Sequence, residues 1–230
     1  DAESWPDQSV SYRELYLTPE GTSDVPIGGE MSINSPQSLG MMSGDYMPLD
    51  ADPGKAQMPG DQRTEDAGAL CFDLPVQGDP FDIIGTCVAE FEVSTDAGNG
   101  LLAVRLCDVS PDGSSTLITY GIMNIAQRDG REAQADVQPS TPYQLSLTLN
   151  DIAHRVLPGH TLRIAVSNAM FPMAWPVAEN HTLTLHLHNC KIRIPNADLT
   201  ASDAARVVFQ QPRVAQAAPV EIVEQGRPSR

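Results

Sequence analysis

The sequence predicts an all-β protein, and its strand pattern is that of a β-sandwich of the jelly-roll type. Apolar runs of strand length follow one another at short intervals from residue 69 onwards. Two of these runs alternate between apolar and polar residues with a period of two, as a strand with one solvated face does. The 19 prolines and 17 glycines among 230 residues favour short strands joined by turns over long helices.

The first predicted strand covers residues 12–17 and precedes a region rich in turn-forming residues. Residues 30–62 show no period of 2 or 3.6, so we expect an ordered surface loop or a flexible arm there. The strands of the body then follow in chain order at 69–74, 83–93, 101–109, 116–123, 143–149, 161–167, 182–188 and 191–194.

The turns between these strands have a recognisable chemistry. Asn99-Gly100 is typical of a tight hairpin, and Pro111 and Pro158 each begin a further turn. Helix is scarce: one helical turn is expected within 150–157, and either a short helix or a strand at 201–209.

The predicted organisation is one domain in three parts. Residues 1–62 supply an N-terminal strand and a long acidic Pro/Gly-rich loop region, residues 63–200 form the sandwich body, and residues 201–230 form a frayed tail. Residues 1–70 hold 13 acidic and 3 basic residues, a net charge of −10 within a total of −16. This balance excludes nucleic acid and anionic membranes as partners, because both repel a polyanion.

Three features predict a cytoplasmic protein. No apolar run is long enough to span a membrane, and the first ten residues lack the basic and apolar regions of a signal peptide. The cysteines have no CxxC spacing, so we expect buried free thiols, with one or two disulfides as the alternative. The four cysteines are Cys71, Cys87, Cys107 and Cys190.

The sequence offers few candidates for catalysis or metal binding. The nucleophile elbow GxSxG is missing, and Ser43 sits in a Pro/Gly loop, so we interpret it as an ordinary loop serine. The side chains of His186, His188 and Cys190 share one face of a predicted strand, as a metal site would require. That face is also the polar face of the strand, so the metal site is the weaker hypothesis.

Two further groups are interpreted as structural. His154 and His160 bracket a turn and are expected to bond to loop backbone. The stretch DADPG at 50–54 resembles a fragment of a calcium loop, but it lacks the bidentate acid at the end of such a loop. We therefore expect neither a metal nor a cofactor.

An apolar, proline-stiffened segment at 170–180 is the candidate contact surface. It holds Trp175, one of two tryptophans beside Trp5, and burial within its own domain is the equally weighted alternative. Aromatic residues make up only 5% of the chain, which disfavours a carbohydrate-binding platform. The interface candidates are Phe171, Pro172, Trp175 and Pro176.

Motifs in five consecutive segments share the order and spacing of a known family. The segments are 59–75, 82–96, 103–130, 149–167 and 171–176, and residues 5–21 match the first strand. The most specific motif comprises Arg105, Leu106, Asp108, Val109, Pro111, Asp112, Gly113, Ser115, Thr119, Gly121 and Arg128. Together these segments resemble the C-terminal β-sandwich domain of the X-Pro dipeptidyl-peptidase and cocaine esterase family of serine hydrolases. Thr161 departs from the pattern, since the family has arginine there.

The resemblance implies a galactose-binding-like jelly roll and a strand pair within 82–96 that includes Gly85. It also implies that the Ser-Asp-His residues lie in an α/β-hydrolase domain upstream, so no catalytic residue is carried onto this sequence. That catalytic domain is the implied partner, and a homo-oligomer is also compatible with the resemblance.

Three functional hypotheses follow. The first is a non-catalytic domain that packs on the α/β-hydrolase domain and shapes its cleft, in a parent that hydrolyses acyl esters or amides and releases X-Pro dipeptides. The alternative is a stand-alone module that binds carbohydrate or peptide. The third is a metalloenzyme that uses His186, His188 and Cys190.

Overall fold

Two antiparallel sheets make up the protein, as seen in a computed structural model that describes residues 10–44 and 58–197. The strands are β1 Val10–Thr18, β2 Gly21–Ser23, β3 Glu30–Ile33, β4 Leu70–Pro75, β5 Phe81–Gly85, β6 Val88–Thr95, β7 Leu101–Val109, β8 Ser115–Asn124, β9 Tyr143–Thr148, β10 Ile152–Val156, β11 Thr161–Ser167, β12 Leu183–His186 and β13 Lys191–Ala197. The short helices are η1 Met41–Ser43, α1 Arg63–Asp66, η2 Ile125–Gln127 and η3 Leu187–Asn189. The prediction of an all-β sandwich is confirmed, and the jelly-roll and galactose-binding-like details stay predictions.

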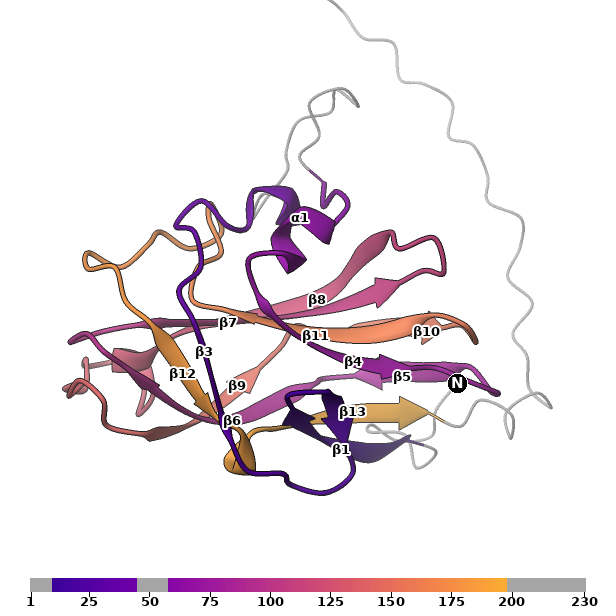
Figure 1. Cartoon of the computed structure of the whole chain (residues 1–230), viewed down its shortest axis with the longest axis horizontal. Helices are drawn as coiled ribbons and strands as arrows, with labels where there is room; N and C mark the ends of the chain where they lie inside the picture. The colour runs from indigo at the N-terminus through magenta and orange to yellow at the C-terminus, as the bar shows by residue number, and fades with distance from the viewer. Residues whose placement is uncertain (1–9, 45–57, 198–230) are drawn as a thin grey trace, which may run out of the picture. The chain divides into compact units, whose positions relative to one another are not determined.

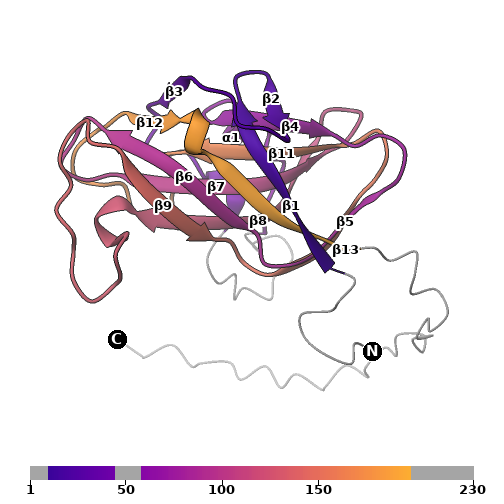
Figure 2. The same cartoon turned by 90° about the horizontal axis from the view of Figure 1, so that it is seen from below.

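The larger sheet has nine strands and the smaller has four. The larger runs in the order β10-β5-β13-β6-β12-β3, with β1 on β13, β2 on β1 and β9 on β6. The smaller runs in the order β4-β11-β7-β8. Figure 1 shows β7 and β8 above β6 and β13, and Figure 2 shows β1 beside β13 and β9 beside β6. The described residues belong to a single compact unit.

The hydrophobic core lies between the two sheets. Strand β7 contributes Leu102, Val104 and Leu106, while Phe91 and Leu145 come from the opposite sheet. Alternate residues of a strand point to opposite faces, so the intervening positions of β7 point away from this core. These positions are buried as well, which means that the outer face of β7 is also covered.

Several predicted boundaries were wrong, for local reasons. The predicted strand 83–93 is two strands, β5 and β6, because the chain bends at Gly85, whose φ is 121°. The strand pair implied by the resemblance is therefore present. Residues 150–157 were expected to hold a helical turn but contain β10, which pairs with β5. The predicted strand 182–188 ends at His186, where η3 begins.

Residues 30–62 also proved more structured than expected. Strand β3 pairs with β12, η1 follows, and the chain re-enters the described part at residue 58, before α1. Trp5, residues 50–54 and the segment 201–209 lie outside the described residues. Within 10–44 and 58–197, no helix has the length and apolar character needed to cross a membrane.

Candidate domain interface

The outer face of the four-stranded sheet carries charged side chains that strand pairing brings together. In the register of the sheet, Arg163 of β11 lies opposite Asp73 of β4, and Arg105 of β7 lies opposite Ala165 of β11. Three segments cover this face, and we call them the cap: residues 38–44, 58–69 and 168–177. Figure 1 shows α1, which belongs to the cap, on the side of β7 and β8 that faces away from β6 and β13.

Asp66 of α1 is the centre of a buried ionic network. Its Oδ1 lies 3.1 Å from Nη1 of Arg105, and its Oδ2 lies 3.2 Å from Nη1 of Arg163. The hydroxyl of Ser115 donates a third contact to Oδ2, at 2.8 Å. Arg105 is 1% exposed, so its charge cannot be solvated by water and is compensated by the Asp66 carboxylate.

Arg163 extends this network toward the edge of the sheet. Its Nε and Nη2 each donate to one carboxylate oxygen of Asp73, both at 2.8 Å. This bidentate hydrogen bonding to Asp73 raises the pKa of the Arg163 guanidinium above its ordinary value. The guanidinium therefore stays charged and ties β11 to both β4 and the cap.

Hydrogen bonds inside the cap fix its backbone. Oε1 of Glu65 accepts from the backbone N–H of Met42 at 3.0 Å, and its Oε2 accepts from the backbone N–H of Gly40. The Gln62 amide donates to the carbonyls of Met42 and Gly60, at 2.6 and 2.8 Å. Gln62 also accepts from Arg105 at 2.9 Å, which connects the cap to the ionic network.

Gly40 allows two cap segments to touch. Its φ is 112°, and a Cβ at this position would lie 2.7 Å from backbone atoms of Met170 and Phe171. Only glycine fits such a close approach at a positive φ. The backbone N–H of Phe171 donates to the carbonyl of Leu39 at 2.6 Å, so residues 38–44 and 168–177 form one continuous surface.

The cap exposes several large apolar side chains beside the charged Arg63. Met41, Met42 and Met58 are 64%, 42% and 66% exposed, and Trp175 is 82% exposed. These four are half of the eight large hydrophobic side chains that are exposed within the described residues. A surface of this kind, on a rigid base, is typical of a contact site for another protein surface.

The predicted interface residues lie on this cap. The Phe171 ring is half-buried and meets the Trp175 ring edge-on, with centroids 6.0 Å apart and planes at 75°. Pro172 is exposed after a cis peptide bond, and Pro176 is half-buried. The Tyr120 hydroxyl donates to Sδ of Met173 at 3.7 Å, which holds the loop against β8.

The sequence reasoning missed the methionines of the cap. Met41, Met42 and Met58 lie in the stretch that was expected to be a loop or an arm, and their number was the only available signal. Ser43 lies in the same stretch, at the end of η1. It is buried, and its hydroxyl donates to Oε1 of Gln62 at 3.1 Å. Its role here is to brace the cap.

The three residues weighed as a metal site, His186, His188 and Cys190, do not share one face, because the strand ends at His186 and η3 follows. His186 lies 3.0 Å from both the Ser94 hydroxyl and a Glu30 carboxylate oxygen. His188 is exposed, whereas Cys190 is buried in the core. Across residues 10–44 and 58–197, no cluster of three or more His, Cys, Asp or Glu side chains could hold a metal ion.

His154 and His160 contact a carboxylate rather than the loop backbone expected for them. Nε2 of His154 lies 2.9 Å from Oδ2 of Asp108, and Nδ1 of His160 lies 2.7 Å from Oδ1. Asp108 belongs to β7, while His154 belongs to β10 of the larger sheet. The three side chains therefore connect the two sheets at one end of the sandwich. Their spacing in the sequence gave no sign of this contact.

All four cysteines are free thiols, as expected. Cys87, Cys107 and Cys190 are buried and Cys71 is half-buried. Burial, which disfavours the thiolate, raises the pKa of Cys71 to about 11 and the pKa of each of the other three to about 12.

Comparisons with known proteins point to one family. A family model described as the X-Pro dipeptidyl-peptidase C-terminal non-catalytic domain matches residues 1–213. The cocaine esterase of Rhodococcus sp. (strain MB1 Bresler) is 27% identical in an alignment of 186 residues, which covers 75% of this chain and 32% of that protein.

Solved structures share the fold. An aminopeptidase from the marine sediment archaeon Thaumarchaeota archaeon aligns with a TM-score of 0.74 and 18% identity, over 86% of this chain and 38% of that one. An α-amino acid ester hydrolase aligns with a TM-score of 0.66 and 19% identity, over 80% and 36%. A CocE/NonD family hydrolase from Staphylococcus aureus aligns with a TM-score of 0.63 and 11% identity, over 86% of this chain and 38% of that one. The chain thus spans about a third of the length of these relatives.

Proposed function

Because this chain belongs to the X-Pro dipeptidyl-peptidase C-terminal non-catalytic domain family, we propose that it serves a serine hydrolase as its C-terminal domain. In this proposal the cap packs on an α/β-hydrolase catalytic domain of the same parent protein and shapes the cleft in which the substrate binds. The catalytic residues belong to that other domain, and this chain contributes architecture.

The observation that carries the proposal is the contrast between the base and the top of the cap. The base is fixed by the buried Asp66 and Arg105 and by the half-buried Arg163, all of which are charged. The top presents Met41 and Trp175 to solvent. Because hydrogen bonds already hold the backbone of the cap, docking costs little backbone entropy, and burial of its apolar side chains is favourable.

We propose that the parent hydrolyses acyl esters or amides. The relatives are named as a cocaine esterase, an aminopeptidase and an α-amino acid ester hydrolase, so their names span both bond types. An X-Pro dipeptide as the product is the finer form of this proposal, and it rests on the family description.

The same proposal covers compartment and assembly. Four free thiols support a reducing compartment such as the cytoplasm. The proposal includes a homo-oligomer, because an isolated chain with its cap uncovered would self-associate through the same surface.

Docking of the cap can be followed through Trp175. The chain is produced with 5-fluorotryptophan and with the change Trp5→Phe, so that Trp175 gives the single fluorine signal. The unlabelled catalytic domain of the parent protein is then added. We expect the signal of Trp175 to shift and broaden as its ring leaves solvent, and the double change Met41→Ser and Met58→Ser to weaken domain association at least tenfold.

The matched control is Val25→Ser, which changes an exposed apolar residue outside the cap, at 61% exposure. It is expected to leave association unchanged. Domain association that leaves the Trp175 signal unmoved would place the interface elsewhere, and a failure of the two domains to associate would remove the proposal.

A further inference from the structure

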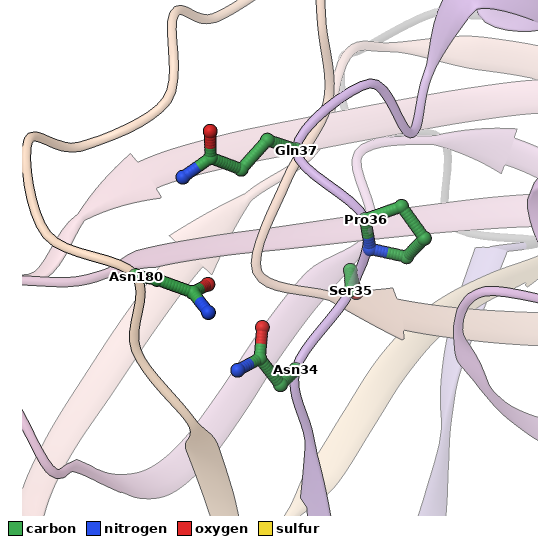
Figure 3. A pocket seen from close by; sticks show the side chains of 5 residues that line it. All are labelled: Asn34, Ser35, Pro36, Gln37 and Asn180. Atoms are coloured by element: carbon green, nitrogen blue, oxygen red, sulfur yellow. The ribbon is translucent and has the colours of Figure 1, made fainter.

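An open polar pocket lies beside the cap. It has a volume of about 600 Å³ and is lined by Asn34, Ser35, Pro36, Gln37 and Asn180. Figure 3 shows the side chains of Asn34 and Asn180 turned toward one another, with the Gln37 carboxamide near them. Among the described residues, none of these three carboxamides has a hydrogen-bond partner. Each offers two N–H donors and a carbonyl acceptor to a ligand.

The lining residue Ser35 is held in place by Asn168, which is 6% exposed. Its Oδ1 accepts from the backbone N–H of Ser35 at 2.7 Å, and its Nδ2 donates to the carbonyl of His181 at 2.7 Å. The Ser35 hydroxyl donates to the carbonyl of Gly68 at 2.9 Å. Three separate segments are thereby locked together, so the pocket does not have to form when a ligand arrives.

Strand β3 leads directly into this pocket and forms the edge of its sheet. Among the described strands it pairs only with β12. The backbone N–H of Leu187 donates to the carbonyl of Gly29 at 2.9 Å, and residues along an antiparallel pair alternate between bonded and non-bonded positions. Met31 and Ile33 therefore bond to β12. The backbone groups of Glu30 and Ser32 point to the open edge.

We propose that the edge of β3 and the adjoining pocket bind an extended polypeptide segment. The segment adds as a further strand to β3, and one of its amide groups enters the space between Asn34, Gln37 and Asn180. Main-chain bonds supply the affinity, as in other cases of strand addition to a sheet edge, and the carboxamides select an uncharged polar group.

The surroundings of the pocket favour a peptide over other ligands. No Trp, Tyr or Phe is among its lining residues, so a sugar ring has no aromatic platform there. Glu30 and Glu179 flank the site, and the chain carries a net charge of −16, so the segment is neutral or basic. The proposal does not depend on docking of the cap.

The test uses a capped hexapeptide of alternating Thr and Val with one terminal Lys, added to the ¹⁵N-labelled chain. We expect saturable shifts of the backbone amides of residues 30–37 and of Asn180. A second peptide, N-methylated at alternate residues so that one edge loses its donors, is expected to bind at least tenfold more weakly. Shifts elsewhere, or equal binding of the two peptides, would overturn strand addition.

Two pairs of variants separate the contribution of the β3 backbone to peptide affinity from that of the pocket carboxamides. Ser32→Pro removes a backbone N–H that faces the open edge and is expected to lower affinity at least tenfold, whereas Ser32→Ala keeps this donor and is expected to retain binding. Asn34→Ala combined with Asn180→Ala is expected to cost about tenfold, while Gln144→Ala, an exposed amide on β9, changes nothing. If Ser32→Pro lowers the melting temperature, the N-methylated peptide carries the test. Shifts with maltohexaose but not with the peptide would also overturn the proposal.

Discussion

The two outer faces of the sandwich carry similar sets of charges in different surroundings. Where the cap meets the four-stranded sheet, the side chains of Arg105 and Asp66 are 2% and 5% exposed. On the nine-stranded sheet, Lys191 lies 2.9 Å from Glu14, and their side chains are 26% and 42% exposed. On the nine-stranded sheet, strand pairing places opposite charges side by side, as with Glu14 and Arg193. On the four-stranded sheet, the partner of Arg105 comes from α1 of the cap. Only the cap removes one set from water.

This difference in exposure changes how much each set of charges contributes to the stability of the fold. A buried charge loses its hydration, so losing its partner leaves an uncompensated charge in the protein. An exposed ion pair regains water when it breaks and is screened by salt. We therefore assign the buried set the role of holding the cap in place, and the exposed set a minor role in stability.

Breaking the buried network around Asp66 is expected to lower the stability of the protein more than any other change. Asp66→Asn keeps the shape of the side chain but removes the charge that Arg105 and Arg163 share. We expect the free energy of unfolding to fall by about 3–5 kcal/mol, measured by urea denaturation. Glu14→Gln is the matched change on the other face. Equal losses in the two variants would show that the cap does not set the difference.

A double variant sharpens the same comparison. Arg105→Met combined with Asp66→Leu replaces the central pair by apolar groups, while Arg163 keeps Asp73. We expect the double variant to be more stable than Asp66→Asn alone, because no unpaired charge is left at Arg105. A double variant that is no more stable than Asp66→Asn would contradict an uncompensated Arg105 charge as the cause of the loss.

The two faces also differ in how far the sequence predicts them. The strands follow from local patterns, such as the alternation of Leu145 and Leu147, both of which lie in the core. Asp66 and Arg163 lie 97 residues apart, and no local period connects them. The charge of Arg105 within an apolar strand was a signal of a covered outer face, but it does not name a partner.

The cap and pocket were missed for a related reason. Residues 34–44 take their conformation from contacts with distant segments, such as Ser35 with Asn168 and Gly40 with Phe171. Phe171 and Trp175 could be proposed from composition alone. The methionines that complete their surface could not, because tertiary contacts place them.

Buried thiols extend the comparison to groups without a charged partner. Burial raises the pKa values of Cys87, Cys107 and Cys190 to about 12, from an ordinary value of 9.0. Their contribution to stability is therefore complete below pH 9 and is lost as the pH rises toward 12, because the unfolded chain releases these protons first. At pH 10 the expected loss is about 1.4 kcal/mol for each thiol.

Cys190→Ala isolates one of these contributions. The drop in the free energy of unfolding between pH 7.5 and pH 10, measured with urea under reducing conditions, should be smaller in the variant by about 1.4 kcal/mol. Comparing the drop within each protein cancels the cost of the smaller side chain. An identical drop in the two proteins would contradict burial as the cause of the raised pKa.

The smallest effect is expected for the exposed charges of the nine-stranded sheet. Lys191 contacts Glu14 at 2.9 Å and Glu90 at 3.4 Å, and the hydrogen bond with Glu14 raises the pKa of its ammonium. Lys191→Met keeps the apolar stem, so only the charge is lost. We expect a loss of less than about 1 kcal/mol at low salt, and a still smaller loss at high salt. A larger loss that salt does not reduce would show that the exposed charges are coupled as tightly as those beneath the cap, and the cap would then no longer explain the contrast.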